Sequence, residues 1–202
     1  DHAPSLTVAR GLTTARLHEQ LAEVARLNEE LAPFRILTGI EVDIREDGSL
    51  DQDDDVLAGL DVVVASAHSK LRREAGAMTR RLVRAVANPR VNVLGHVTGR
   101  LITGGRGTRP ESTFDAELVF EACASFDVAL EINSRPERRD PPTRLLELAH
   151  EVGCLFSIDS DAHAPGQLDL LDHGAARAQA LGIPRERIVN TRTAAALLAW
   201  SR

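Results

Sequence analysis

The sequence predicts an α/β domain on a parallel sheet, either open or closed into a barrel. Short runs of β-branched residues alternate along the chain with segments whose apolar residues recur every three or four positions. A polar residue stands at or just beyond each strand end, at separations of 27, 28, 37 and 28 positions, namely Glu41, His68, His96, Asn133 and Asp161. Because the carboxyl ends of such strands share one face, these side chains are expected to meet. Ligand-type residues from at least four strand ends favour a barrel, complete or partial.

The first half of the chain begins with an amphipathic helix. Its apolar residues recur at steps of three and four over residues 14–31, and Pro33 ends it. The run at 35–44 is rich in β-branched residues, and the run at 61–68 is apolar on both faces, so both are expected to be buried strands. A helix is expected at 74–87, before the proline that follows Asn88.

The second half continues the alternation of strands and helices. The expected strands cover 91–96, 128–133 and 154–159, and the expected helices cover 111–125, 141–152, 172–181 and 193–200. Prolines at the start of the 141–152 segment fit the first turn of a helix. No Gly-rich nucleotide-binding fingerprint follows the first strand, which argues against a dinucleotide-binding fold.

Composition indicates one domain and limits the classes of partner. The 202 residues are 43% apolar, which is enough for a sizeable core. A formal charge of -6 argues against binding nucleic acid through bulk positive charge alone, although carboxylates gathered around metal ions would give the same count. Cys123 and Cys154 are too few for a disulfide framework, so we expect two free thiols and a cytoplasmic protein. No apolar run approaches 18 residues, so no membrane partner is expected.

The stretch SIDSDAHAPG, residues 157–166, places two carboxylates and an imidazole at alternate positions after the last strand (Asp159, Asp161, His163). A mixed set of His, Glu and Asp suits Zn²⁺, Mn²⁺ or Fe²⁺ better than Ca²⁺. Two such cations about 3.5–4 Å apart can activate water and stabilise a phosphoryl displacement. Glu41 is the candidate bridge between two cations.

Six stretches together carry a family resemblance. The strings TGIEVDI, VVASAHS, VLGHVTGR, ALEINSRP and SDAHAPG, together with the opening DHAP, resemble the PHP (polymerase and histidinol phosphatase) family. More narrowly, they are similar to the C-terminal PHP domain of bacterial family X DNA polymerases and to stand-alone relatives. The resemblance covers nearly the whole chain, so it implies a single PHP phosphoesterase domain over residues 1–202. It also implies a distorted, TIM-barrel-like (β/α)7 barrel with up to three divalent metal ions in the intact protein.

The resemblance also implies which residues bind metal. Motif by motif, the ligands are His2, Glu41, His68, His96, Asp161 and His163. Glu41 would be shared between two metals, with His68 and His96 on one of them and Asp161 on the other. His2 and His163 would then hold the third metal. Glu41 and Asp161 are also assigned as catalytic, together with Arg100 from the Thr-Gly-Arg motif.

The sequence departs from the family pattern at its beginning. The family's first strand, with a His-x-His motif and a nearby Asp, precedes the Asp-His motif and is absent here. The chain is therefore expected to be an N-terminally truncated fragment that binds fewer metals and has impaired activity. A polymerase or helix-hairpin-helix region could precede it in the parent chain. Val97 replaces a common Pro, with little expected effect.

Several other polar residues have two readings. Arg106 and Arg109 could hold phosphates or lie in a solvated Gly-rich loop with Arg100, and Lys70 is better explained as a surface residue. Asn133 could orient a ligand or make a structural hydrogen bond. Asp159 is not expected to bind metal; it could orient an imidazole or be a polar residue of the barrel interior. The acidic run at 51–55 lacks the Gly and Glu of an EF-hand and is expected to be a turn and helix start.

The expected reaction is hydrolysis of a phosphate ester by water activated at a metal centre, with no side-chain nucleophile. The resemblance and the basic loop favour processing of DNA 3′ ends by a 3′–5′ exonuclease, usually with manganese. One alternative is a small-molecule phosphatase resembling histidinol phosphatase. Another is a non-catalytic structural or regulatory module of a polymerase.

Overall fold

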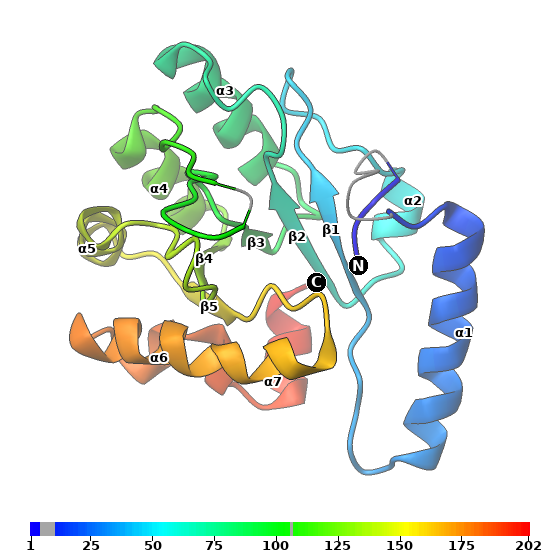
Figure 1. The fold of residues 1–202 in the computed structure, drawn as a ribbon. Helices are drawn as coiled ribbons and strands as arrows, with labels where there is room; N and C mark the ends of the chain where they lie inside the picture. Colours follow the sequence, from blue (N-terminus) through cyan, green and yellow to red (C-terminus); the bar gives the residue numbers. More distant parts are fainter. Residues whose placement is uncertain (5–10, 106) are drawn as a thin grey trace.

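The computed structural model describes residues 1–4, 11–105 and 107–202 (Figure 1). Arg106, one of the arginines considered for phosphate binding, lies outside the described residues. The strands are β1 (Gly39–Asp43), β2 (Val62–Ser66), β3 (Val93–Leu94), β4 (Ala129–Asn133) and β5 (Phe156–Asp159). The helices are α1 (Thr14–Glu30), α2 (Asp54–Leu57), α3 (Ala75–Val86), α4 (Ala116–Ser125), α5 (Thr143–Val152), α6 (Leu171–Ala180) and α7 (Ala194–Trp200).

Each predicted strand contains an observed strand, and each predicted helix overlaps an observed one. The predicted helix at 111–125 begins later, at Ala116, because the Asp115 side chain accepts a hydrogen bond from the Leu118 backbone N–H and caps the helix there. Within the described residues, no helix is both long enough and apolar enough to cross a membrane. The elements therefore agree with the α/β prediction.

The sheet is parallel throughout, and its strand order follows the chain order. A doubly wound sheet would show a reversal in this order, so the topology is compatible with a TIM-like fold. Isolated parallel bridges extend both edges, from His2 to Glu41 beside β1 and from Phe156 to Ile188 beside β5. No pairing among the described residues joins β5 back to β1. The closed (β/α)7 barrel thus stays a prediction.

The two faces of the sheet differ in chemistry. On the outer face, side chains such as Val42 and Leu130 belong to one apolar cluster with Leu82, Phe120 and Leu146 of α3, α4 and α5, which lie on that side in Figure 1. On the inner face, Val93 and Ala129 pack with Val189, Leu197 and Trp200, the last two from α7. Because successive residues of a strand face opposite sides, the acidic residues near the carboxyl ends point to the inner face.

A buried cation joins the loops after β1 and β2. Arg81 of α3 is 1% exposed. Its Nε donates to the carbonyls of Ile44 and Arg45, each at 3.0 Å, and its Nη1 donates to the carbonyl of Ser69 at 2.8 Å. These bonds hold the ends of two strands that supply site residues. Arg81 is therefore a support of the site, although it does not line it.

We expect Arg81→Met to lower the free energy of unfolding by about 3 kcal/mol, because it leaves the buried carbonyl of Ile44 and the partly buried carbonyls of Arg45 and Ser69 without their charged donor. Urea denaturation followed by circular dichroism measures the change. The exposed neighbour Arg80 is the control, and Arg80→Met should stay within about 0.5 kcal/mol of the unsubstituted protein. Equal stability of the two variants would contradict this role for Arg81.

Both cysteines are free and buried, as predicted from the sequence. Burial raises the pKa of Cys154 to about 12 and holds the pKa of Cys123 well above its ordinary value. Because the thiolate is the reactive form, we expect neither thiol to react with a disulfide reagent at pH 8 in the folded protein, and both to react in denaturant. Rapid labelling of the folded chain would show that the cysteines are accessible.

Candidate metal centre

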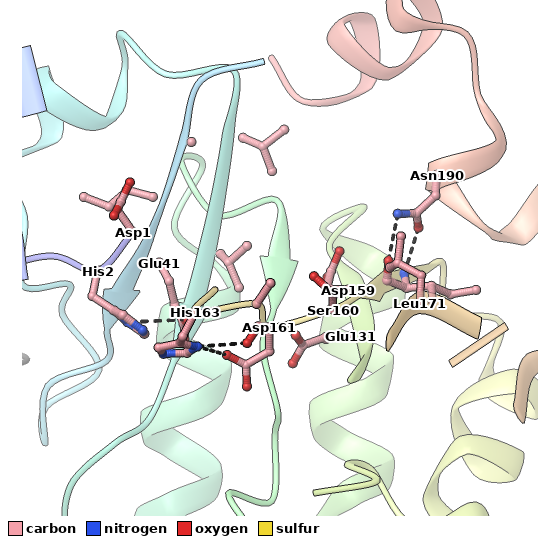
Figure 2. Close-up of a pocket in the computed structure, with 16 residues that line it drawn as sticks. Asp1, His2, Glu41, Glu131, Asp159, Ser160, Asp161, His163, Leu171 and Asn190 are labelled. Carbon is pink, nitrogen blue, oxygen red and sulfur yellow. Dashed lines mark hydrogen bonds and ion pairs between the residues drawn. The ribbon is translucent and has the colours of Figure 1, made fainter. Parts of the chain in front are cut away.

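The six predicted ligands lie around the carboxyl ends of the strands. Glu41 is in β1, His68 and His96 each follow their strand by two residues, and Asp161 follows β5 by two. His2 lies in the bridge beside Glu41, and Figure 2 shows His2, Glu41, His163 and Asp161 gathered along one wall of a pocket. This cavity of about 780 Å³ is also lined by three further acidic residues, Asp1, Glu131 and Asp159. The strand-end spacing therefore correctly indicated residues that share one face.

Glu41 is the centre of the imidazole cluster. Its Oε1 lies 3.0 Å from His96 Nε2 and 3.2 Å from His68 Nε2, and its Oε2 lies 3.5 Å from His2 Nδ1. The ligand atoms of His2, Glu41 and His68 all lie within 4.8 Å of one another. Burial by itself raises the pKa of Glu41, but the imidazoles of His68 and His96 hold it well below its ordinary value. The carboxylate is thus charged and surrounded by nitrogen donors.

These contacts have a geometry that could hold a metal ion. Glu41 Oε1 and His2 Nδ1 are enclosed, yet neither has a well-aligned hydrogen-bond partner among the described residues. Nitrogen and oxygen ligands about 2.0–2.1 Å from one ion stand about 2.9–3.4 Å apart at tetrahedral or octahedral angles. The observed separations of 3.0 and 3.2 Å fall in that interval. Imidazole and carboxylate together suit Zn²⁺, Mn²⁺ or Fe²⁺.

Asp43 orients His68 and was not identified from the sequence. Its Oδ1 accepts a hydrogen bond from the His68 backbone N–H at 2.9 Å and lies 3.1 Å from the ring Nδ1. With the Nδ1 proton directed at this carboxylate, Nε2 faces Glu41 and can bind a cation once it has lost its own proton. Burial by itself lowers the pKa of His68, but Asp43 and Glu41 raise it to about 9. The signal for Asp43 was its position, two residues after Glu41 on the same strand face.

Glu131 of β4 supports His96 and was also missed. Its Oε2 accepts a hydrogen bond from the His96 backbone N–H, and its Oε1 accepts one from Asn133 Nδ2 at 3.3 Å. The residue is 4% exposed. Burial, together with the charges of Asp159, Asp161 and Glu41, raises its pKa well above the ordinary value. This crowding of carboxylates is what bound cations would relieve.

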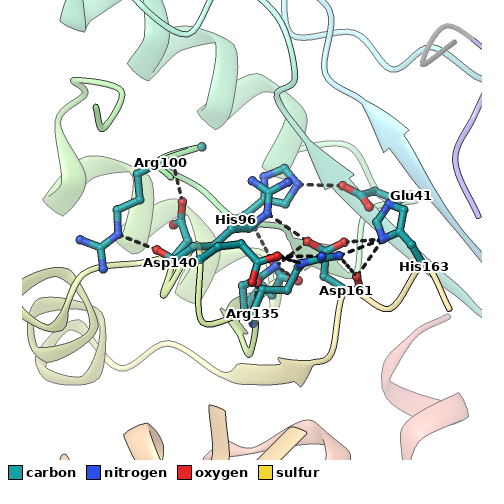
Figure 3. Close-up of polar contacts among 12 residues, drawn as sticks. Glu41, His96, Arg100, Arg135, Asp140, Asp161 and His163 are labelled. Carbon is teal, nitrogen blue, oxygen red and sulfur yellow. Dashed lines mark hydrogen bonds and ion pairs between the residues drawn. The ribbon is translucent and has the colours of Figure 1, made fainter. Parts of the chain in front are cut away.

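Asp161 is held from three sides. Its Oδ2 accepts hydrogen bonds from Arg138 Nε at 3.0 Å and from Asn133 Nδ2 at 3.2 Å, and its carbonyl accepts one from Arg135 Nη1 at 2.8 Å (Figure 3). Its φ of 49° is left-handed, a conformation that Asp adopts more readily than most residues. His163 Nδ1 lies 2.9 Å from the same carbonyl, which leaves Nε2 free as a ligand atom.

The remaining candidates are placed differently. Arg100 donates to the carbonyl of Arg138 at 3.0 Å and pairs with Glu111 at 3.2 Å, and Figure 3 shows its head directed away from His96 and Glu41. It does not line the large cavity, and its catalytic role stays a prediction. Lys70 is exposed. Asp159 accepts hydrogen bonds from Ser157 rather than orienting an imidazole, and burial raises its pKa to about 6.

Curated proteins similar to this chain are named for reactions on phosphate esters. The chain is 39% identical over 193 residues to the DNA polymerase/3′-5′ exonuclease PolX of Bacillus subtilis. The aligned region makes up 96% of this chain and 33% of that protein. A probable phosphatase of Thermoanaerobacter sp. strain X514 is 26% identical over 201 residues, 95% of this chain and 76% of the relative. One of Vibrio parahaemolyticus is 29% identical over 168 residues, 78% of this chain and 64% of the relative. The chain thus spans about a third of the polymerase relative, and no protein-family model matches it.

We expect Asp43→Ala to weaken Mn²⁺ binding about 10–100-fold, because His68 loses the carboxylate that fixes its ring. Equilibrium dialysis with metal analysis measures the affinity. Asp55→Ala, which removes an exposed carboxylate of α2, is the control and should bind Mn²⁺ like the unsubstituted chain. A folded Asp43→Ala protein with unchanged affinity would mean that Asp43 does not position the ligand.

Proposed function

We propose that the chain is a PHP domain and that it acts as a metal-dependent phosphoesterase that processes DNA 3′ ends. The observation that carries the proposal is the enclosed Glu41 carboxylate, which faces three imidazoles with no well-aligned hydrogen bond to its Oε1. The names of the relatives support the coarser reading, since an exonuclease and a phosphatase both hydrolyse phosphate esters. Activity on DNA is the finer part of the proposal.

Different residues of this chain would bind the cations and position the ligands. Glu41, His68 and His96 would hold one cation, while Asp161, His163 and His2 would complete the centre. When bound, the cations lower the pKa of water and offset charge on the phosphoryl oxygens. Asp43 keeps the Nε2 atom of His68 directed toward Glu41, and Glu131 fixes the backbone of His96.

The centre needs no side-chain nucleophile. Ser66, two residues before His68, is fully buried, and its Oγ is enclosed without a hydrogen-bond partner among the described residues. Gly95 is close beside it, since a Cβ on Gly95 would stand 2.2 Å from Ser66 Oγ. Ser66 therefore cannot reach a substrate, and attack by water is the consistent mechanism.

A polynucleotide substrate is favoured over a small ester by the space around His163. This residue lines the large cavity and also a second one of about 340 Å³, whose walls include Leu101, Thr103 and Arg135. A substrate longer than one phosphate monoester could occupy both. The alternative of a small-molecule phosphatase is favoured by the probable phosphatases among the relatives, one of which the chain covers over 76% of its length.

The test is hydrolysis by the chain with Mn²⁺ of single-stranded DNA labelled at its 5′ end, and of histidinol phosphate. We expect DNA to shorten from the 3′ end, and we expect Glu41→Gln to reduce the rate at least about 100-fold because the cation loses its central carboxylate. Glu46→Gln, on the exposed turn after β1, is the matched control. Hydrolysis of histidinol phosphate but not of DNA would contradict the DNA assignment. A fully active Glu41→Gln protein would contradict the proposed metal centre.

A further inference from the structure

The loop between β4 and α5 carries a buried arginine next to a predicted ligand. Arg138 is 6% exposed, and its side chain contacts Asp161 through Nε at 3.0 Å. Asp161 lines the large cavity, so the guanidinium stands just behind the cavity wall. Its neighbour Arg139 is exposed to solvent. A charged group this deep in a protein normally has several partners.

Arg138 uses little of its hydrogen-bonding capacity. A guanidinium has five N–H donors, and among the described residues only Nε of Arg138 donates a hydrogen bond, to Asp161 Oδ2. Nη1 is enclosed without any partner. Nη2 also donates to no described residue and, unlike Nη1, is not among the fully enclosed atoms. Buried charged donors without acceptors are costly, so an acceptor from outside the chain is expected.

The two other arginines close to the site are already engaged. Arg135 directs Nε and Nη2 to Glu137 Oε1 at 2.8 and 2.7 Å, and its Nη1 donates to the Asp161 carbonyl. Arg100 pairs with Glu111 and donates to the carbonyl of Arg138. Arg100 therefore braces the segment that carries Arg138. Among these three arginines, Arg138 is the one whose Nη1 and Nη2 both donate to no described residue, and its Nε contacts Asp161 of the cavity wall.

The negative charge around the cavity indicates what the Arg138 guanidinium could bind there. Glu41, Asp159 and Asp161 line this cavity, and the negative charge of their carboxylates would repel a phosphate group. Resting on the phosphoesterase function above, we propose that Arg138 binds a non-bridging oxygen of the scissile phosphate through Nη2, while Nε holds Asp161. The planar fork of Arg suits this double role, since it can bridge a carboxylate and a phosphate.

The test measures binding of inorganic phosphate to the Mn²⁺-loaded chain by equilibrium dialysis with radiolabelled phosphate. Arg138→Gln should weaken phosphate binding at least about tenfold, as expected for loss of a charged hydrogen bond. Arg138→Lys should weaken it less, because it retains the charge but not the fork. Arg139→Gln is the matched control and should bind phosphate normally. Metal content and melting temperature are measured in parallel, since a purely structural Arg138 would alter them and leave phosphate binding unchanged.

Three results would overturn the proposal. Arg138→Gln could bind phosphate as tightly as the unsubstituted chain, Arg139→Gln could weaken binding as much as Arg138→Gln does, or the unsubstituted chain could bind no phosphate. If Arg138→Gln does not fold, the Arg138→Lys protein decides, and unchanged phosphate binding there would overturn it. Hydrolysis assays separate this inference from the proposed function. Phosphate binding that depends on Arg138 without hydrolysis of any ester would uphold the inference and reject the function. If the unsubstituted chain hydrolyses an ester, and Arg138→Gln has unaltered phosphate binding and KM, the function is upheld and the inference is rejected.

Discussion

The structure depends on the crowding of carboxylates and imidazoles at the carboxyl ends of parallel strands. Glu41 stands at its centre, with nitrogen atoms of His68 and His96 within 3.2 Å of one oxygen. Such groups repel each other or remain unsatisfied unless cations are shared among them. The surrounding residues hold this cluster in place. Asp43 and Glu131 each fix one histidine, and the loop after β4 holds Asp161.

The topology explains how these residues meet. In a parallel sheet whose strand order follows the chain, every βα unit returns the chain to the same edge, so each strand end adds one side chain there. The outer face is filled by apolar residues and covered by α3, α4 and α5, and the inner face is closed at its amino end by α7. The polar end of the inner face is thereby left as a cavity of about 780 Å³.

The sequence predicted much of this because the signals are local. Strand and helix patterns, and the recurrence of Glu41, His68, His96 and Asp161 once per βα unit, need no knowledge of tertiary contacts. Asp43, Glu131 and Arg138 were missed because charged residues are common near strand ends, and only packing decides which of them points inward. Arg100 was favoured for its motif, yet it is Arg138 that contacts Asp161 in the cavity wall, through a contact between loops distant in sequence. Barrel closure likewise depends on pairing between distant segments.

The central claim is that Glu41 and its imidazoles form a metal centre. Anomalous X-ray diffraction from crystals of the chain grown with Mn²⁺ tests it most directly, because it locates the ion without reference to activity. The account predicts an anomalous peak about 2.0–2.3 Å from a Glu41 oxygen and from Nε2 of His68 or His96. Crystals in which Glu41 accepts hydrogen bonds from protonated imidazoles, with no anomalous peak beside it at saturating Mn²⁺, would contradict it.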